Sequence, residues 1–242
     1  MNNFKKFLSY ELRKIKYKLF GFEKVFHNKN NSEIFDEIYQ KGYWGKSNDG
    51  LTSSGDGSHN PKLIFPYISS VKNFLINKDN SIIVDIGCGD FNIGKNFVNY
   101  AHRYVACDVS EFILKRNIKR YSSYNNLEFK KLDLSLDTPP EGDICILRQV
   151  LQHISNQDII NFCNKINSYN PYKYLILTEH LPLIEKFTFN LDKPSGPKTR
   201  LGIGSGVILH KPPFNLKFKK FYLLNNVVNL DSQIKTIVYE FI

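Results

Sequence analysis

The stretch from Ile82 to Gly94 constrains the fold of this chain more than any other. It begins with an apolar, largely β-branched run, Ile82 to Ile86, which is typical of a buried parallel strand. A Gly-x-Gly turn at Gly87 and Gly89 follows at once. Glycine is required where backbone amides must approach a ligand closely or where φ is positive. The stretch therefore predicts the first strand and turn of a nucleotide-binding α/β fold.

Acidic residues separate this turn from a dinucleotide-binding turn. The spacing is Gly-x-Gly-x-x-x-x-Gly, whereas NAD-binding turns have Gly-x-Gly-x-x-Gly. Asp85 lies in the strand and Asp90 follows the second glycine, which disfavours a pyrophosphate and suits a ligand with a positive amino group. Asp108 ends the next predicted strand, 19 residues after Gly89, close to the ~20 expected for a carboxylate that binds a ribose.

The segment from Val84 to Gly89, with the sequence VDIGCG, resembles motif I of class I S-adenosylmethionine (SAM)-dependent methyltransferases. Asp133 is similar to motif II of this family, and Arg148 to His153 resemble the stretch after its fourth strand. The resemblance implies SAM as cofactor and S-adenosylhomocysteine (SAH) as product. Pro212 to Phe214 and a segment ahead of motif I look similar to methyltransferases associated with bacterial surface-polysaccharide synthesis.

Apolar periodicity divides the chain into alternating helices and strands, which predicts an α/β fold. We expect helices at 3–22, 33–41, 60–75, 93–100, 110–121 and 158–170, and strands at 82–86, 104–107, 127–131, 142–147, 174–178, 206–209, 218–224 and 234–241. The resemblance implies a doubly wound, Rossmann-like, mostly parallel seven-stranded sheet with a C-terminal antiparallel hairpin. We divide the chain into an N-terminal helical cap with a basic helix and a cofactor lid, residues 1–75, and a core, residues 76–242, with a substrate loop at 181–211.

A polar, glycine-rich loop, Ser53 to Ser58, lies ahead of the core and near the only tryptophan, Trp44. It resembles a segment that, in a subset of the family, closes over the methionine end of the cofactor; the alternative is a flexible surface loop. From the resemblance and the strand ends, we expect the cofactor to be bound by Trp44, Ser54, Gly55, Ser58, Asp85, Gly87, Gly89, Asp90, Asp108, Val109, Asp133, Leu134, Arg148 and Gln149.

Methyl transfer depends chiefly on alignment, and a hydroxyl acceptor also profits from a base near neutral pKa. His153 and His180 follow the fourth and fifth predicted strands, so we expect His153, and then His180, to be the base; the alternative is that each is a structural histidine. We expect Glu179, Lys198 and Arg200 to bind the acceptor, and the two cations suit a phosphate. The expected acceptor is a sugar, or a phosphorylated or nucleotide-linked sugar, of capsule or lipopolysaccharide synthesis.

The net charge of the chain is +10, and its first 30 residues hold eight basic and two acidic residues. Apolar residues recur at helical spacing over residues 3–22 with lysines on the other face, which predicts either contact with an anionic membrane surface or docking on the domain. We expect a cytoplasmic protein that can lie at the inner face of the membrane, because we find neither a signal peptide nor an apolar stretch long enough for a span.

Four cysteines without C-x-x-C spacing predict buried thiols rather than a zinc site or disulfides. We expect no metal, because the cofactor claims most of the carboxylates, and no nucleic-acid partner, because basic and aromatic residues do not interleave beyond residue 30. Three rival functions stay open: an RNA or protein methyltransferase, a nicotinamide-dependent sugar enzyme, and a non-catalytic SAM-binding subunit.

Overall fold

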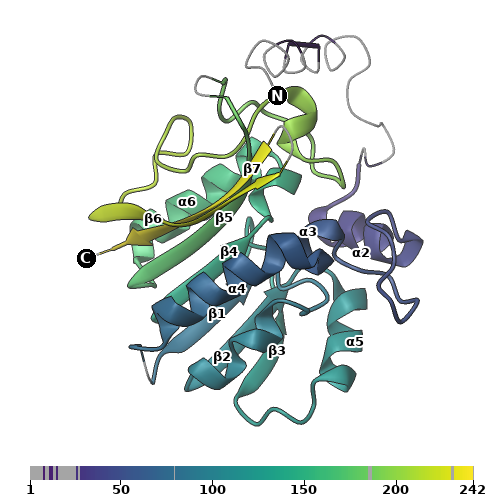
Figure 1. Cartoon of the computed structure of the whole chain (residues 1–242), viewed down its shortest axis with the longest axis vertical. Coiled ribbons are helices and arrows are strands. Elements are labelled where there is room, and N and C mark those ends of the chain that lie inside the picture. The colour runs from purple at the N-terminus through teal and green to yellow at the C-terminus, as the bar shows by residue number, and fades with distance from the viewer. Residues whose placement is uncertain are drawn as a thin grey trace.

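The computed structural model describes residues 8, 11, 12, 15, 26, 28–78, 80–184, 187–229 and 232–241. Within them, seven strands form one sheet in the order β3-β2-β1-β4-β5-β7-β6 (Figure 1). The strands are β1 (Ile82–Ile86), β2 (Arg103–Asp108), β3 (Leu127–Lys131), β4 (Ile144–Arg148), β5 (Tyr174–Pro182), β6 (Lys220–Asn229) and β7 (Ser232–Glu240). Strands β1 to β5 run parallel, and β7 pairs antiparallel with β5 and β6. The predicted mostly parallel sheet with a C-terminal hairpin is confirmed.

Helices cover both faces of the sheet, with α4 and α6 on opposite sides (Figure 1). The α-helices are α2 (Asn31–Lys41), α3 (Asp56–His59), α4 (Pro61–Leu75), α5 (Glu111–Arg120) and α6 (Asn156–Tyr169), and the 3₁₀ helices are η2 (Gly94–Asn96), η3 (Val98–Tyr100), η4 (Leu151–His153) and η5 (Arg200–Ile203). Side chains of β1 alternate between two cores: Ile83 packs in the cluster that contains α4, and Val84 in the one that contains α6. Burial on both faces explains why β1 is apolar throughout except at Asp85.

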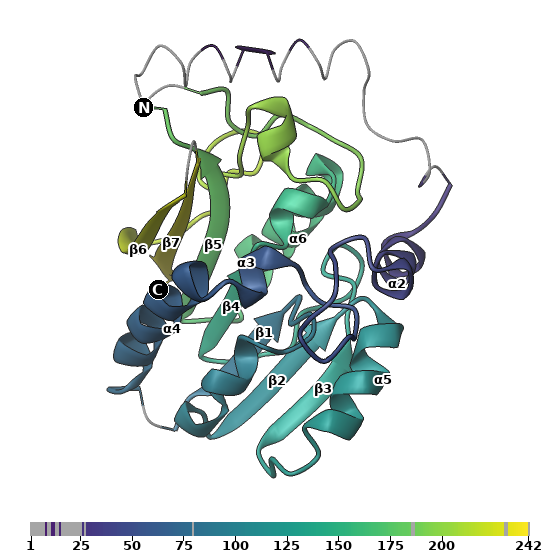
Figure 2. The same ribbon diagram turned by 45° about the vertical axis from the view of Figure 1, so that its right-hand side comes forward.

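Helix α2 lies beside α5 and is fixed to its first turn (Figure 2). The Asp36 carboxylate accepts hydrogen bonds from the Ser110 hydroxyl at 2.6 Å and from the Phe112 amide at 3.0 Å. Asp36 therefore satisfies an amide at the start of α5 that has no partner within its own helix. This contact places α2, and the chain that follows it, next to the carboxyl ends of β1 and β2.

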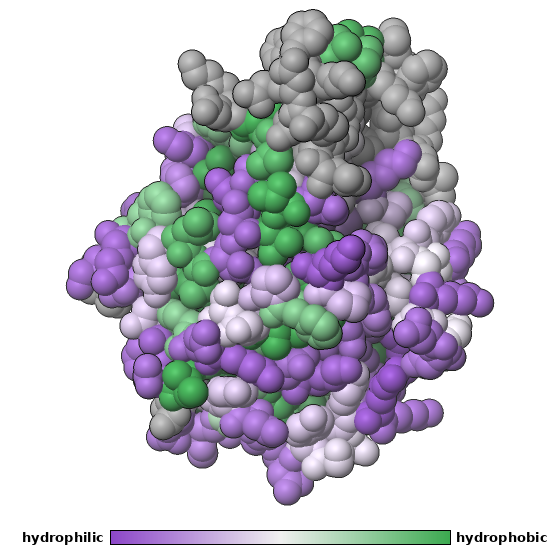
Figure 3. All heavy atoms as spheres, viewed as in Figure 1, coloured by the Kyte–Doolittle hydropathy of each residue, from purple (hydrophilic) through white to green (hydrophobic). Residues whose placement is uncertain are grey.

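Helix α4 is amphipathic, as its periodicity predicts. Leu63, Tyr67 and Val71 are buried against the sheet, whereas Lys62 and Phe65 are exposed. Hydrophilic residues cover much of the face of the molecule shown in Figure 3, and hydrophobic residues form an irregular band across that face.

The predicted helix over 93–100 is instead the two short 3₁₀ helices η2 and η3. A side chain at Gly94 would approach the ring of Phe91 to 2.3 Å, so the chain uses glycine here, and glycine is a poor residue inside an α-helix. Because Phe91 packs closely against Gly94, this segment forms two short 3₁₀ helices and not a regular α-helix.

The predicted strand over 206–209 is wrong, because Asn190 takes over the hydrogen bonds of this segment. The Asn190 amide donates to the Gly206 carbonyl at 2.9 Å, and the Ile208 amide donates to Asn190 Oδ1 at 2.8 Å. The backbone amide and the side chain of Asn190, rather than a neighbouring strand, thus organise this part of the loop.

The predicted N-terminal helix over 3–22 lies almost entirely outside the described residues and stays a prediction. Among the described helices, none combines the length and the apolar content needed to span a bilayer. All four cysteines carry free thiols, with Cys107, Cys145 and Cys163 buried and Cys88 partly buried, which agrees with the predicted buried thiols.

Candidate functional site

A cavity of about 300 Å³ lies at the carboxyl ends of β1, β2 and β4, where open parallel sheets bind their ligands. Its walls also include helix α2, the β6–β7 hairpin and part of residues 47–59, a stretch that we call the lid segment and that contributes Ser54, Asp56, Gly57 and Ser58. The predicted cofactor residues that line it are Trp44, Ser54, Ser58, Asp85, Gly87, Gly89, Asp90, Asp108, Val109, Asp133, Leu134, Arg148 and Gln149. The two predicted base residues, His153 and His180, line it as well.

The two glycines of the turn leave no room for side chains. Gly87 has a φ of +75°, and a Cβ there would lie 2.3 Å from Cγ2 of Val150. Gly89 has a φ of +57°, and a Cβ there would lie 2.3 Å from Oγ of Ser54. Other residue types would strain this backbone and clash with Val150 or Ser54, so glycine is required at both positions of the turn.

Asp108 ends β2 with its carboxylate against the glycine turn. Its Oδ2 accepts a hydrogen bond from the Gly89 amide at 2.9 Å, and its Oδ1 accepts one from the Ser110 amide at 2.9 Å. Burial raises the pKa of Asp108 to about 6, although these amides act in the opposite direction. Each carboxylate oxygen can accept a second hydrogen bond, so Asp108 can still receive ligand hydroxyls.

Asp85 is a second buried carboxylate on the cavity. Its Oδ2 accepts a hydrogen bond from the Tyr104 hydroxyl at 2.9 Å. Burial raises the pKa of Asp85 to about 7, and the Tyr104 hydroxyl and the charge of Arg148 partly oppose this. Two buried carboxylates with raised pKa values favour a ligand that brings positive charge or hydroxyl donors.

Arg148 and Asp133 are both held by neighbours. Nη2 of Arg148 donates to the Gly57 carbonyl at 2.7 Å, and its guanidinium lies 4.7 Å from the centre of the Tyr67 ring. Oδ1 of Asp133 accepts from the amide and the hydroxyl of Ser135 at 2.8 and 2.7 Å. Arg148 therefore ties the lid segment to the end of β4, and Asp133 is oriented at the end of β3.

His153 faces the cavity from η4, with its ring 5.0 Å from that of Trp44. Nε2 of Gln152, which can only donate, lies 3.1 Å from Nε2 of His153, so the hydrogen of the neutral imidazole is on Nδ1, 3.3 Å from the Gly196 carbonyl. Burial, and then the charge of Lys193, lower the pKa of His153 to about 3. Both ring nitrogens are therefore engaged, and the ring stays neutral.

His180 lies on β5 and faces the β6–β7 hairpin. Its Nε2 lies 2.8 Å from the Ser232 hydroxyl, which donates its one hydrogen to the Asn229 carbonyl at 2.9 Å. Ser232 therefore accepts from His180, so the neutral imidazole carries its hydrogen on Nε2. The hairpin thus sets the tautomer of His180.

Arg200, predicted to bind the acceptor, does not reach the cavity. It is fully buried and donates to the carbonyl oxygens of Leu151, Ile154 and Leu191 and to Oδ1 of Asn156. The prediction for Arg200 is therefore wrong, because its guanidinium is buried and donates its hydrogen bonds to η4 and the chain around it.

Three other predicted residues also lie away from the cavity lining. Glu179 is 3% exposed, and burial raises its pKa to about 8 against the charge of Arg200 and the nearby backbone amides of Leu151 and Gln152. Lys198 is exposed beside a separate small hollow. Gly55 packs on Trp44, since a Cβ there would lie 3.3 Å from Cβ of Trp44. Direct ligand contact by Glu179 or Gly55 does not fit these placements.

Charge is unevenly distributed along the cavity, and we name its two ends accordingly. The acidic half lies at β1, β2 and β3 and holds Asp85, Asp90, Asp108 and Asp133. The neutral half lies towards β5, β6 and β7 and is lined by His153, His180, Thr199, Asn229 and Ile234. Among the described residues, no group of three or more His, Cys, Asp or Glu side chains gathers as a metal site would require.

Helices α2 and α4 also contribute to this cavity, which was not predicted from the sequence; the further lining residues include Asn31, Phe35, Tyr39, Leu63 and Tyr67. A signal was present, because Phe35 and Tyr39 stand four residues apart on one face of a predicted helix. Both rings pack near Trp44, at centroid distances of 6.1 and 5.3 Å.

No protein-family model matches the chain, and no curated protein matches its sequence. Solved structures do share its fold. N-methyltransferase NodS from Bradyrhizobium japonicum WM9 in complex with SAH has a TM-score of 0.57 at 12% identity, covering 85% of this chain and 99% of NodS. The N-terminal domain of EvdMO1 in the presence of SAH and D-fucose has a TM-score of 0.52 at 12% identity, covering 85% and 96%. The methyltransferase domain of bacterial CtHen1 has a TM-score of 0.51 at 12% identity, covering 72% and 97%. This chain therefore has the Rossmann-like fold of SAM-dependent methyltransferases.

Proposed function

We propose that the chain is a SAM-dependent methyltransferase that methylates a sugar hydroxyl. One observation carries the proposal: an acidic half with a bare glycine turn and a neutral half share a single cavity. NodS and the EvdMO1 domain, which have the same fold, were both crystallised with SAH. Open parallel sheets bind their ligands at the carboxyl ends of the strands, which is where this cavity lies.

The residues of the acidic half fit SAM by shape and by chemistry. Gly87 and Gly89 hold the turn on the cavity wall in a left-handed backbone conformation that a side chain would strain. Asp108 would accept hydrogen bonds from the ribose hydroxyls, and Asp85 would face the positively charged methionine end. Asp133 would accept a hydrogen bond from the adenine amino group. When bound, SAM supplies a methyl group activated by its positively charged sulfur.

The neutral half favours an acceptor without charge at its reacting end, because a charge there would lose its hydration without gaining a partner. Thr199 and Asn229 offer neutral hydrogen-bonding groups and Ile234 offers apolar surface, a mixture that suits a sugar ring. The EvdMO1 domain was crystallised in the presence of a sugar, D-fucose. A phosphate on the acceptor would lie outside the cavity, where Lys198 is exposed. We propose that the sugar belongs to capsule or lipopolysaccharide.

We propose His180 as the base that takes the proton of the acceptor hydroxyl. His180 lines the cavity and is oriented by Ser232 of the hairpin, whereas His153 has both ring nitrogens engaged and a pKa lowered to about 3. This order reverses the expectation from the sequence, which placed His153 first.

Replacing His180 with glutamine is expected to lower kcat about 100-fold or more, the usual effect of losing a general base, and to leave SAH affinity within about threefold. His153→Gln is expected to lower kcat less than about tenfold. Methyl-transfer kinetics and calorimetric SAH binding check both variants. A large loss of kcat in His153→Gln alone would restore His153 as the base.

The acceptor class is tested with methyl-labelled SAM, purified protein and an unmethylated extract of its own host. The extract is then separated into polysaccharide, nucleotide-sugar, lipid, RNA and protein fractions. Label in polysaccharide or nucleotide-sugar is expected. Label in RNA or protein would instead make the basic N-terminal segment a substrate-binding arm. SAH binding without label in any fraction would support a non-catalytic subunit.

A further inference from the structure

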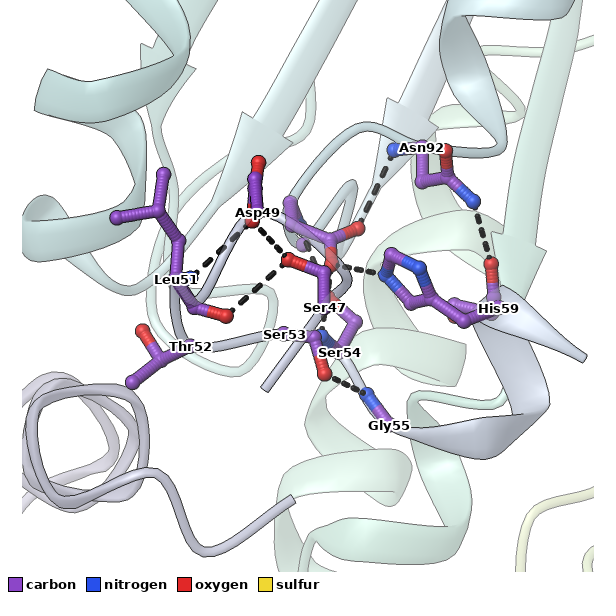
Figure 4. Close-up of polar contacts among 12 residues, drawn as sticks. Ser47, Asp49, Leu51, Thr52, Ser53, Ser54, Gly55, His59 and Asn92 are labelled. Atoms are coloured by element: carbon purple, nitrogen blue, oxygen red, sulfur yellow. Dashed lines mark hydrogen bonds and ion pairs between the residues drawn. The ribbon is translucent and has the colours of Figure 1, made fainter. Parts of the chain in front are cut away.

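Asp90 fastens the lid segment to the glycine turn by two reciprocal hydrogen bonds. Its Oδ2 accepts from the Ser54 amide at 2.8 Å, and its own amide donates to the Ser54 hydroxyl at 2.8 Å. Asn92 adds a third tie, since its side-chain nitrogen donates to the Ser58 carbonyl at 2.7 Å and its amide donates to Oδ1 of Asp90 at 3.2 Å. Figure 4 shows Ser54, His59 and Asn92 gathered around this junction.

His59, at the end of the lid segment, adds an ionisable contact to the same carboxylate. Its Nε2 lies 2.6 Å from Oδ2 of Asp90, and the two side chains are 29% and 7% exposed. The bond from Asp90 raises the pKa of His59, against the effect of burial. Burial raises the pKa of Asp90, but the bonds from His59 and the Ser54 amide outweigh it, so this pKa lies below its usual range. Below the raised pKa of His59, the contact is an ion pair.

His59 also lines a second hollow, of about 230 Å³, which gives solvent access to its ring. The titratable and charged groups that face it are Asp49, Asp90, Lys95, Arg116, Arg120 and Tyr121, together with Asp56 on its own helix. Asp49 is bound to Arg120 at 2.8 Å and to the Ser47 hydroxyl (Figure 4). Asp90 is therefore the partner that dominates the titration of His59.

We propose that Asp90 and His59 are positioning residues that form a clamp, which keeps the lid segment closed over the bound ligand and slows its release. Asp90 lines the cavity, but its oxygens already accept from Ser54, His59 and Asn92. Through Ser54 and His59 it therefore acts on the lid segment. The identity of the ligand, SAM or SAH, rests on the proposed function, whereas the clamp itself does not.

The pH dependence of the clamp follows from the direction of the His59 shift. The pKa of His59 is raised while the lid segment is closed, so protonation favours closure. The stabilisation of the closed lid segment by protonated His59 is fully present below the ordinary histidine pKa of about 6.5. It is lost as the pH rises through the raised pKa of His59. A partly exposed ion pair changes an equilibrium constant by up to about fivefold.

Hydrogen–deuterium exchange over residues 47–59 of the ligand-free protein tests the clamp directly. His59→Gln keeps a donor but cannot ionise, so it is expected to exchange about threefold to fivefold faster than wild type at pH 6 and equally at pH 9. His102→Gln is the matched control: His102 is exposed beside the start of β2, at the opposite end of the sheet, and its variant is expected to match wild type at both pH values. Equal exchange of wild type and His59→Gln at pH 6 would overturn the clamp.

SAH release, followed by stopped-flow displacement, tests the effect on the ligand. Trp44 is the only tryptophan of the chain and lines the cavity, so its fluorescence reports release. The release rate of His59→Gln relative to wild type is expected to be about three to five at pH 6 and about one at pH 9. Faster lid exchange with unchanged release would refute control of release by the clamp. If wild type bound no SAH, the proposed function would fail, and the exchange experiment would still decide the clamp.

Discussion

Replacing Asp108 with alanine is expected to weaken SAH binding about 30-fold. The change removes a carboxylate that would accept hydrogen bonds from the ribose hydroxyls, and a hydrogen bond to a charged group is worth about 2 kcal/mol. It also frees the Gly89 amide from the bond that orients the glycine turn. Calorimetry at pH 8 measures the effect, because the Asp108 carboxyl, with a pKa of about 6, is ionised there.

Glu128→Gln is the control for Asp108→Ala. Glu128 is a half-exposed carboxylate on the neighbouring strand β3, where it pairs with Arg103 away from the cavity lining. We expect this variant to bind SAH as wild type does. Equal affinity of wild type and Asp108→Ala would refute the ribose role of Asp108.

Replacing Arg200 with methionine is expected to lower the free energy of unfolding by about 3–5 kcal/mol, the cost of breaking a buried charged network from one side. The guanidinium donates to the carbonyl oxygens of Leu151 and Ile154, at the two ends of the segment that carries His153. Methionine fills the volume but leaves these carbonyls without a donor. Chemical denaturation, followed by far-UV circular dichroism, measures the loss.

Arg103→Met is the matched control for Arg200→Met. Arg103 is 55% exposed and, among the described residues, pairs with the surface carboxylate of Glu128, so its loss is expected to cost less than about 1 kcal/mol. If Arg200→Met kept wild-type stability but bound the acceptor poorly, Arg200 would be a substrate residue after all, as its position in a polar loop first suggested.

Local sequence pattern was sufficient to predict the parallel strands and the glycine turn, whereas the seven-stranded sheet with its hairpin was implied by the family resemblance. The apolar run of β1, the glycines after it and the acid at the end of β2 are each determined by short-range requirements of strand burial and backbone conformation. The strand ends of a parallel sheet then meet at one edge, so Asp108, Asp133 and His180 were predicted to lie at one site before their distances were known.

Roles that depend on distant partners were not predictable in the same way. Asp90 has the expected place beside the turn, but its partners Ser54 and His59 come from a segment more than 30 residues earlier in the chain. Arg200 lies in a polar loop, and nothing local indicates that this loop folds beneath η4 and buries the guanidinium. Packing between remote segments decided both roles.

Calorimetric titration of the wild-type protein with SAM, SAH, NAD and NADP tests the central claim most directly. We predict one binding site per chain for SAM and SAH, competition between the two, and no detectable heat with either dinucleotide. Asp108→Ala in parallel would assign the site to this cavity. Binding of NAD or NADP without binding of SAH would contradict the account and turn the chain into a nicotinamide-dependent enzyme with a methyltransferase fold.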